Sequence, residues 1–129
     1  MRQNPDNLLI DAACRVRSHA HAPYSNFQVG AAVLTASQEL FVGCNVENVS
    51  FGLTICAERA AICAAIAAGH KKIVAIAVAT AGGHSPCGAC RQVLSEFGPA
   101  MEVLLVDVNE LEKVRRTSLE KLLPERFFL

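Results

Sequence analysis

The amino-acid sequence predicts an α/β fold, with three α/β/α layers arranged around a mixed central sheet. Helical and strand-like segments alternate along the chain in the order α-β-β-α-β-α-β-α, a pattern typical of helices packed on a sheet. Two of the strand-like segments are almost unbroken apolar runs, as expected for strands covered on both faces. The chain has 129 residues, of which 52% are hydrophobic, so we expect residues 1–129 to form a single domain.

The first half of the chain predicts a helix followed by a β-hairpin. Apolar side chains recur at helical spacing from residue 6 to about residue 20, and Pro23 follows this segment. Residues 27–36 and 39–48 are rich in β-forming side chains and are separated by a short polar turn. We expect these two strands to pair antiparallel, although the turn is not the preferred Asn-Gly.

The second half of the chain alternates helices with buried strands. An alanine-rich helix lies within residues 54–69 and closes at Gly69, a residue suited to a helix end. The elements that follow are a central strand at 71–80, a short helix at 87–98, a buried strand at 101–108 and a final short helix at 118–123. Helical crossovers predict parallel pairing between strands, and the charge run at 113–116 is expected to be a solvated face.

Composition and charge exclude several classes of partner. Twelve basic residues balance twelve acidic residues, so the basic stripe that nucleic acids require is not expected. No segment approaches the roughly 20 apolar residues of a membrane span, and Asp6 interrupts the region where a signal peptide would be apolar. We therefore expect a cytoplasmic protein, in which the six cysteines are free thiols or metal ligands rather than disulfides.

Three cysteines fall at the starts of two predicted helices. Cys56 lies in the first turn of the alanine-rich helix, and Cys87 and Cys90 lie in the first turn of the next helix. Ligands of open α/β sheets bind beyond the carboxyl ends of the strands, where these helices begin. The three thiols can therefore hold one zinc ion and leave its fourth position open to water, which is the arrangement of a catalytic zinc site.

Glu58 follows Cys56 by two residues, close to the predicted metal. A hard oxygen ligand is unnecessary where three thiolates bind zinc, so its carboxylate fits the role of general base. The segments CAE (56–58) and PCGAC (86–90) together match the signature of zinc-dependent nucleobase deaminases. Each segment alone is a weak or moderate signal, but the pair, placed on two helix starts, is specific.

The chain resembles the small cytidine deaminases of the tetrameric type over nearly its whole length. The blocks APYSNFQVGAA, GCNVENVSFGLTICAERAA, SPCGACRQVLSEFG and LLPERF match that family in order. The resemblance implies a cytidine deaminase-like fold, Zn²⁺ on Cys56, Cys87 and Cys90, and Glu58 as the proton shuttle. It also implies hydrolytic deamination of cytidine and 2′-deoxycytidine to the uridine nucleosides and ammonia, in pyrimidine salvage.

The same resemblance implies how the nucleoside is held. Asn45 and Glu47 would bind the ribose hydroxyls, and Phe27 would lie against the pyrimidine. The backbone N–H of Ala57 would reach the base carbonyl. Phe127 would close the pocket of a neighbouring subunit, which implies a homotetramer with shared active sites. Without the resemblance, Asn45 could be a turn residue, Glu47 a solvated strand end and Phe27 part of the core.

Two arginines are expected to compensate the charge of the metal centre. Three thiolates on Zn²⁺ leave a formal charge of −1, which weakens the Lewis acidity of the metal. The helix starts at Cys56 and Cys87 each present roughly half a positive charge. Arg59 can add a full charge and donate directly to a thiolate, and Arg91 is expected as a second donor.

Three further residues receive simpler interpretations. His84, three residues before Cys87, is expected to be a polar loop histidine, since three thiolates already fill the ligand set. Cys63 lies about 10 Å further along the helix than Cys56, too far for the same zinc, and is expected in the core. Phe51 stands where a tyrosine is frequent in the family, and the segment AGGH (81–84) matches no familiar pattern.

Other functions remain open at this point. A structural zinc module that binds a protein or RNA would use closed coordination, which three ligands and a balanced net charge disfavour. A deaminase acting on bases inside nucleic acid would need a positively charged groove. The nearest alternative is a deaminase of a cytosine-bearing antibiotic or of a nucleotide, and the segment NVEN (45–48) favours the plain nucleoside.

Overall fold

A five-stranded mixed sheet forms the middle layer of the computed structural model, which describes residues 4–129. The strand order is β2-β1-β3-β4-β5, and β3 and β4 are the parallel pair. β1 is antiparallel to both of its neighbours, and β5 is antiparallel to β4. The strand bounds are β1 Gly30–Thr35, β2 Leu40–Cys44, β3 Ile73–Thr80, β4 Glu102–Asp107 and β5 Arg115–Ser118.

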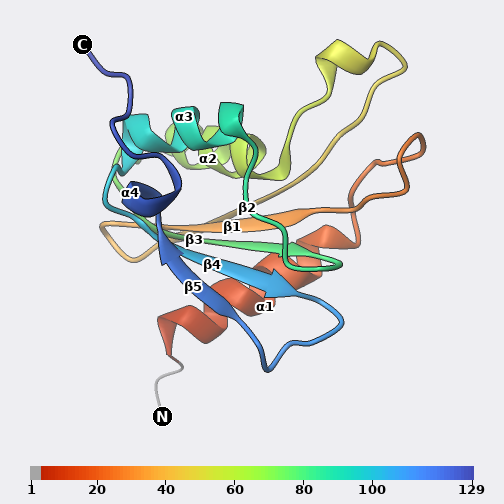
Figure 1. Ribbon diagram of the computed structural model, residues 1–129, viewed down its shortest axis with the longest axis horizontal. Helices are drawn as coiled ribbons and strands as arrows, with labels where there is room; N and C mark the ends of the chain where they lie inside the picture. The colour runs from red at the N-terminus through yellow and green to blue at the C-terminus, as the bar shows by residue number, and fades with distance from the viewer. Residues whose placement is uncertain (1–3) are drawn as a thin grey trace.

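Helices cover both faces of this sheet, which confirms the predicted three-layer fold (Figure 1). One face carries α1, and the other carries α2, α3 and the short α4. Alternate residues of β1 divide between the two layers, so that Ala31 and Val33 pack under α2 while Ala32 and Leu34 pack under α1. The helix bounds are α1 Pro5–Arg17, η1 Phe51–Leu53, α2 Ala57–Ala67, α3 Gly88–Phe97 and α4 Leu119–Leu122.

The helix ends follow from local chemistry. Asn4 caps α1 by accepting a hydrogen bond from the backbone N–H of Asp6 at 2.9 Å, and Pro5 occupies the first helical position, where its missing N–H costs nothing. The chain leaves α2 through Gly69 at φ +95°, a backbone conformation that glycine adopts without strain. α1 ends at Arg17, three residues earlier than expected.

A glycine in β2 sets the position of α2. A Cβ atom at Gly43 would lie 2.4 Å from the backbone nitrogen of Ala61 and 2.6 Å from the carbonyl oxygen of Ala57. The helix therefore rests directly on the strand backbone, at a distance that no side chain allows. This close approach fixes the start of α2, where Cys56 and Glu58 lie.

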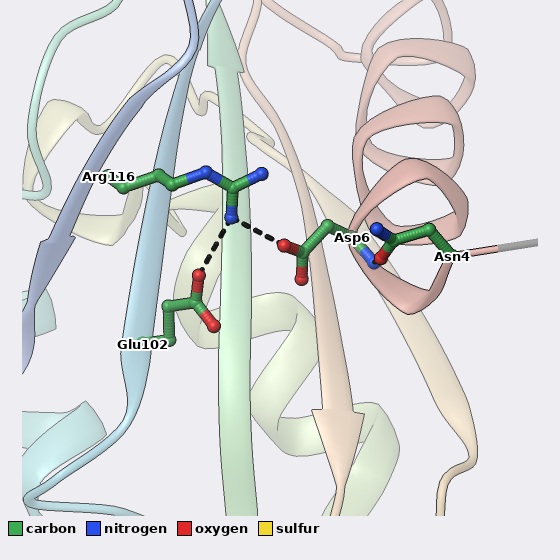
Figure 2. A network of polar contacts seen from close by, with 4 residues as sticks. All are labelled: Asn4, Asp6, Glu102 and Arg116. Carbon is green, nitrogen blue, oxygen red and sulfur yellow. Dashed lines mark hydrogen bonds and ion pairs between the residues drawn. The ribbon is translucent and has the colours of Figure 1, made fainter.

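The structure contains one strand that the sequence pattern did not predict. Residues 113–116 were expected to be a solvated face, and Lys113, Arg115 and Arg116 are exposed as expected. Arg115–Ser118 in addition form β5, an exposed edge strand paired with β4. Figure 2 shows Arg116 of β5 between two carboxylates, where it contacts Asp6 of α1 and donates to Glu102 of β4 at 2.9 Å. Charged side chains are common on edge strands because they discourage further pairing, so polarity alone does not exclude a strand.

The expectation for Cys63 is also corrected. Its side chain is exposed rather than in the core. The buried residues of α2 lie at 57, 58, 61, 62 and 65, so the helical period turns position 63 towards solvent.

Within residues 4–129, no helix is both long enough and apolar enough to cross a lipid bilayer.

Candidate metal centre and substrate pocket

Three cysteine sulfurs converge where α2 and α3 begin. Cys56 and Cys87 are the N-cap residues of α2 and α3, and Cys90 lies in the first turn of α3, fully buried. Their Sγ atoms all lie within 4.8 Å of one another. Neither N-cap side chain bonds the backbone of its own helix, so both sulfurs remain directed to the shared site.

This donor set fits a zinc ion. Three soft sulfur ligands are a typical catalytic zinc set when a fourth position stays open, and bonds of about 2.3 Å to one tetrahedral ion require sulfurs about 4 Å apart. The observed spacing needs only a small closure to meet that requirement. The two helix N-termini direct partial positive charge at the sulfurs and so stabilise them as thiolates.

The hydrogen bonds among these groups favour a thiolate at Cys56. Hydrogen bonding from the Cys90 thiol, and then from Arg59, lowers the pKa of Cys56 to about 5. The same bond to Cys56, together with burial, raises the pKa of Cys90. Arg59 Nη2 lies 3.2 Å from Cys56 Sγ, as the sequence predicted, while its buried Nε has no hydrogen-bond partner in the described part of the chain.

Glu58 lies on the buried side of α2 and lines the same cavity as the cysteines. Only 5% of its surface is exposed, and burial raises the pKa of its carboxyl group to about 7. A carboxyl group that titrates near neutrality can both accept and return a proton during one reaction. The buried carboxyl group of Glu58 is therefore suited to the role of proton shuttle.

A cavity of about 250 Å³ opens beside the sulfurs. Its lining combines the predicted metal and acid–base residues with side chains from the loops at the ends of β1, β2 and β3. The lining residues are Ser25, Phe27, Val29, Asn45, Thr54, Cys56, Ala57, Glu58, Val78, Thr80, His84, Ser85 and Cys87. Phe27, Asn45, Ala57 and Glu58 are thereby brought together with two of the three cysteines in a single pocket.

Asn45 and Glu47 hold the loop that carries Phe27. The buried amide of Asn45 accepts from Val29 N–H and donates to the Phe27 carbonyl, both at 2.8 Å. Glu47 Oε1 accepts from the backbone N–H groups of Tyr24 and Ser25, and its other oxygen binds the Ser25 hydroxyl. An amide has two donor hydrogens and a carboxylate has about four acceptor sites, so both side chains keep free hydrogen-bonding capacity for a ligand.

Two predicted residues lie away from the sulfurs. Arg91, expected as a second donor to a thiolate, instead directs its guanidinium to the carbonyls of Pro86 and Leu122, each at 2.8 Å, and to the Ser85 hydroxyl at 3.1 Å. It therefore ties the segment before Cys87 to α4. Phe127 is 70% exposed in the carboxyl-terminal tail, outside the pocket of its own chain.

The sequence interpretation did not assign several pocket residues. Thr54, Thr80, Ser85 and His84 line the cavity, although His84 was expected only as a polar loop residue. The signal that could have indicated His84 is the Gly82-Gly83 pair before it, since paired glycines at a strand end indicate a special turn.

Known proteins share both the sequence pattern and the fold of this chain. Residues 3–106 match the model of the cytidine and deoxycytidylate deaminase zinc-binding region. A probable cytidine deaminase of Dictyostelium discoideum is 45% identical over 130 residues, covering 98% of this chain and 86% of that protein. A cytidine deaminase of Mycobacterium tuberculosis is 44% identical over 125 residues, covering 95% and 90%. The crystal structure of cytidine deaminase from Burkholderia pseudomallei superposes with a TM-score of 0.88 at 50% identity, covering 94% of this chain and 98% of that one.

Proposed function

The chain belongs to the cytidine and deoxycytidylate deaminase family, and from that premise we propose that it hydrolyses cytidine and 2′-deoxycytidine to the uridine nucleosides and ammonia, a reaction of pyrimidine salvage. The observation that carries the proposal is the buried Glu58, which lies in one turn with Cys56 and lines a cavity together with Cys56 and Cys87, two of the three clustered cysteines. A solvated carboxyl group would keep its ordinary, lower pKa and would be less suited to exchanging protons at neutral pH.

Cys56, Cys87 and Cys90 would hold the zinc ion. When bound, Zn²⁺ supplies the Lewis acidity that lets water act as a nucleophile near neutral pH. Glu58 takes a proton from that water and delivers it to the ring nitrogen next to C4, which makes C4 electrophilic. After the water oxygen has bonded to C4, Glu58 transfers the second water proton to the amino group, which leaves as ammonia.

The pocket residues would orient the base and the sugar. Ala57 is the first residue of α2, where the N–H group has no acceptor within the helix and can donate to the base carbonyl. Phe27 would lie against the pyrimidine. Asn45 in the cavity lining, and Glu47 outside it but bonded to the lining residue Ser25, would use their free hydrogen-bonding capacity to bind ribose hydroxyls. A site with such groups disfavours a free base, because the missing sugar would leave them unpaired.

We also propose that the enzyme is a homotetramer with shared active sites. The segment 46–55 protrudes between β2 and α2 (Figure 1), and its apolar side chains are exposed, with Phe51 at 72%. Phe127 and Phe128 in the carboxyl-terminal tail are exposed as well, and large exposed apolar side chains such as these can be buried when chains assemble. In this assembly Phe127 would reach the pocket of a neighbouring chain. A cytoplasmic location would keep the cysteines reduced for metal binding.

The experiment that tests the function is a loss-of-absorbance assay on cytidine, deoxycytidine, CMP, cytosine and adenosine. We expect turnover of the two cytosine nucleosides and little turnover of the others. Among the described residues, the cavity lining contains no lysine or arginine to pair with a phosphate, which favours nucleoside over nucleotide. Activity on CMP with none on cytidine would overturn the substrate assignment, and activity on none of the five would overturn the proposed function.

A further inference from the structure

His84 forms part of the pocket wall, in the loop between β3 and α3. Its imidazole packs edge-on against the ring of Phe27, with the ring centroids 5.6 Å apart and an interplanar angle of 77°. The two residues come from different loops, one before β1 and one after β3. The edge-to-face contact therefore joins two walls of the cavity through a pair of aromatic rings.

The loop around His84 is built to hold this ring. Gly82 and Gly83 have φ angles of +102° and +69°, in the left-handed region that glycine adopts without strain. A Cβ atom at Gly82 would lie 2.8 Å from His84 Nε2, so the imidazole occupies the space that any other residue would fill.

Two hydrogen bonds anchor the same loop to the sheet. The His84 backbone N–H donates to the hydroxyl of Thr80 at 2.9 Å, and Thr80 is itself buried at the end of β3. The Gly82 backbone N–H donates to Asp107 Oδ1 at 3.0 Å, at the end of β4. His84 is thus placed by two adjacent parallel strands rather than by a free loop.

The expected orientation of the base indicates which of its edges faces the wall that contains His84. In the proposed function, α2 supplies both the Ala57 N–H for the base carbonyl and Glu58 for the adjacent ring nitrogen. The pyrimidine edge that carries these two atoms must face α2, so the C5–C6 edge turns to the walls that other elements supply. The pair of Phe27 and His84 forms such a wall.

We propose that His84 is a positioning and specificity-determining residue, which holds the Phe27 ring against the pyrimidine and narrows the pocket at the C5–C6 edge. The inference rests on the proposed deamination of cytidine. It gives His84 a role in substrate selection, with discrimination against pyrimidine nucleosides that carry a substituent at C5.

The test compares His84→Ala, His84→Leu and His84→Phe, with His19→Ala as a matched control on the exposed chain after α1. KM and kcat are measured for cytidine and 5-methylcytidine on zinc-loaded protein. Loss of an aromatic pair should raise the cytidine KM about three- to tenfold in the Ala and Leu variants, with kcat nearly unchanged. The Phe variant and the control should keep the wild-type KM.

The selectivity between 5-methylcytidine and cytidine distinguishes the two proposed roles of His84, which are to hold the Phe27 ring and to narrow the pocket. The ratio of kcat/KM for 5-methylcytidine to that for cytidine should rise in His84→Ala, which opens the wall, and stay near wild type in His84→Leu, which fills it. Equal cytidine KM in the Leu and Phe variants would overturn the inference, even if His84→Ala fails to fold. Wild-type protein that does not deaminate cytidine would instead overturn the proposed function.

Discussion

Among the features of single residues, the burial of Glu58 is the most important for the proposed chemistry. Burial raises the pKa of its carboxyl group to about 7, so that group can exchange protons near neutral pH. We expect Glu58→Gln to bind zinc and fold normally while losing roughly 10²- to 10⁴-fold in turnover, the usual scale for a positioned acid–base group. Steady-state kinetics and zinc analysis on the same sample check this. Near-normal turnover in a zinc-loaded variant would refute the role of proton shuttle.

We expect Arg59 to offset the negative charge of the sulfurs. Its Nη2 lies 3.2 Å from Cys56 Sγ, so we expect Arg59→Gln to lower turnover on the order of ten- to a hundredfold, as other losses of groups that support metal ligands do. Arg15→Gln, on the exposed face of α1, is the matched control. The measurement is kcat at full zinc occupancy. Unchanged turnover would mean that the two helix N-termini suffice without the guanidinium.

The site residues that the sequence indicates without the family resemblance are those whose spacing is local. Cys56 and Glu58 share one turn, and Cys87 and Cys90 are three residues apart, so helical geometry places each pair without knowledge of the fold. The partners of Arg91 depend on how a distant helix packs, since Leu122 lies 31 residues away. Sequence spacing could not show that contact, and it could not show the contact of His84 with Phe27.

At the scale of elements, the packing of α2 on β2 holds the site in place. A methyl group at Gly43 would meet the backbone of α2, so we expect Gly43→Ala to displace the helix and cost about 1–3 kcal/mol of unfolding free energy, with weaker zinc binding. Gly52→Ala adds the same methyl group where nothing lies within 4 Å and serves as the control. Denaturant unfolding and zinc affinity check both variants. Equal stability of the two would contradict the close packing.

The helices and the apolar strands were predictable because their patterns are strong over many residues. β3 and β4 are nearly continuous apolar runs, and the buried positions of α2 follow the helical period. β5 was missed because its residues are charged or polar and only half of them are partly buried. Its place is set by pairing with β4 and by the contacts of Arg116 with Asp6 and Glu102, which join segments 14 and 110 residues apart (Figure 2).

At the scale of the whole molecule, the proposed shared sites can be tested by mixing chains. Glu58→Gln lacks the acid–base group, and Phe127→Ala lacks the ring expected to enter a neighbouring pocket. When the two are refolded together, a pocket with Glu58 from one chain and Phe127 from another is intact. For random assembly, about a quarter of the sites should regain wild-type kcat/KM.

The parent variants, refolded separately and then mixed without exchange, are the control for this experiment. Sedimentation of wild-type protein should give a species of about four chains of 13.8 kDa. A hybrid sample no more active than the mean of its parents, or a fully active monomer, would contradict the shared site.

The central claim is that three cysteines and Glu58 form a zinc-dependent cytidine deaminase site, and a zinc titration tests it most directly. Wild-type protein is depleted of metal with a chelator, Zn²⁺ is added back in steps, and bound zinc and cytidine turnover are measured on each sample. We expect turnover to rise in proportion to bound zinc and to stop rising at one Zn²⁺ per chain. Full turnover in the metal-free protein, or no turnover in folded protein that holds one Zn²⁺ per chain, would contradict the claim.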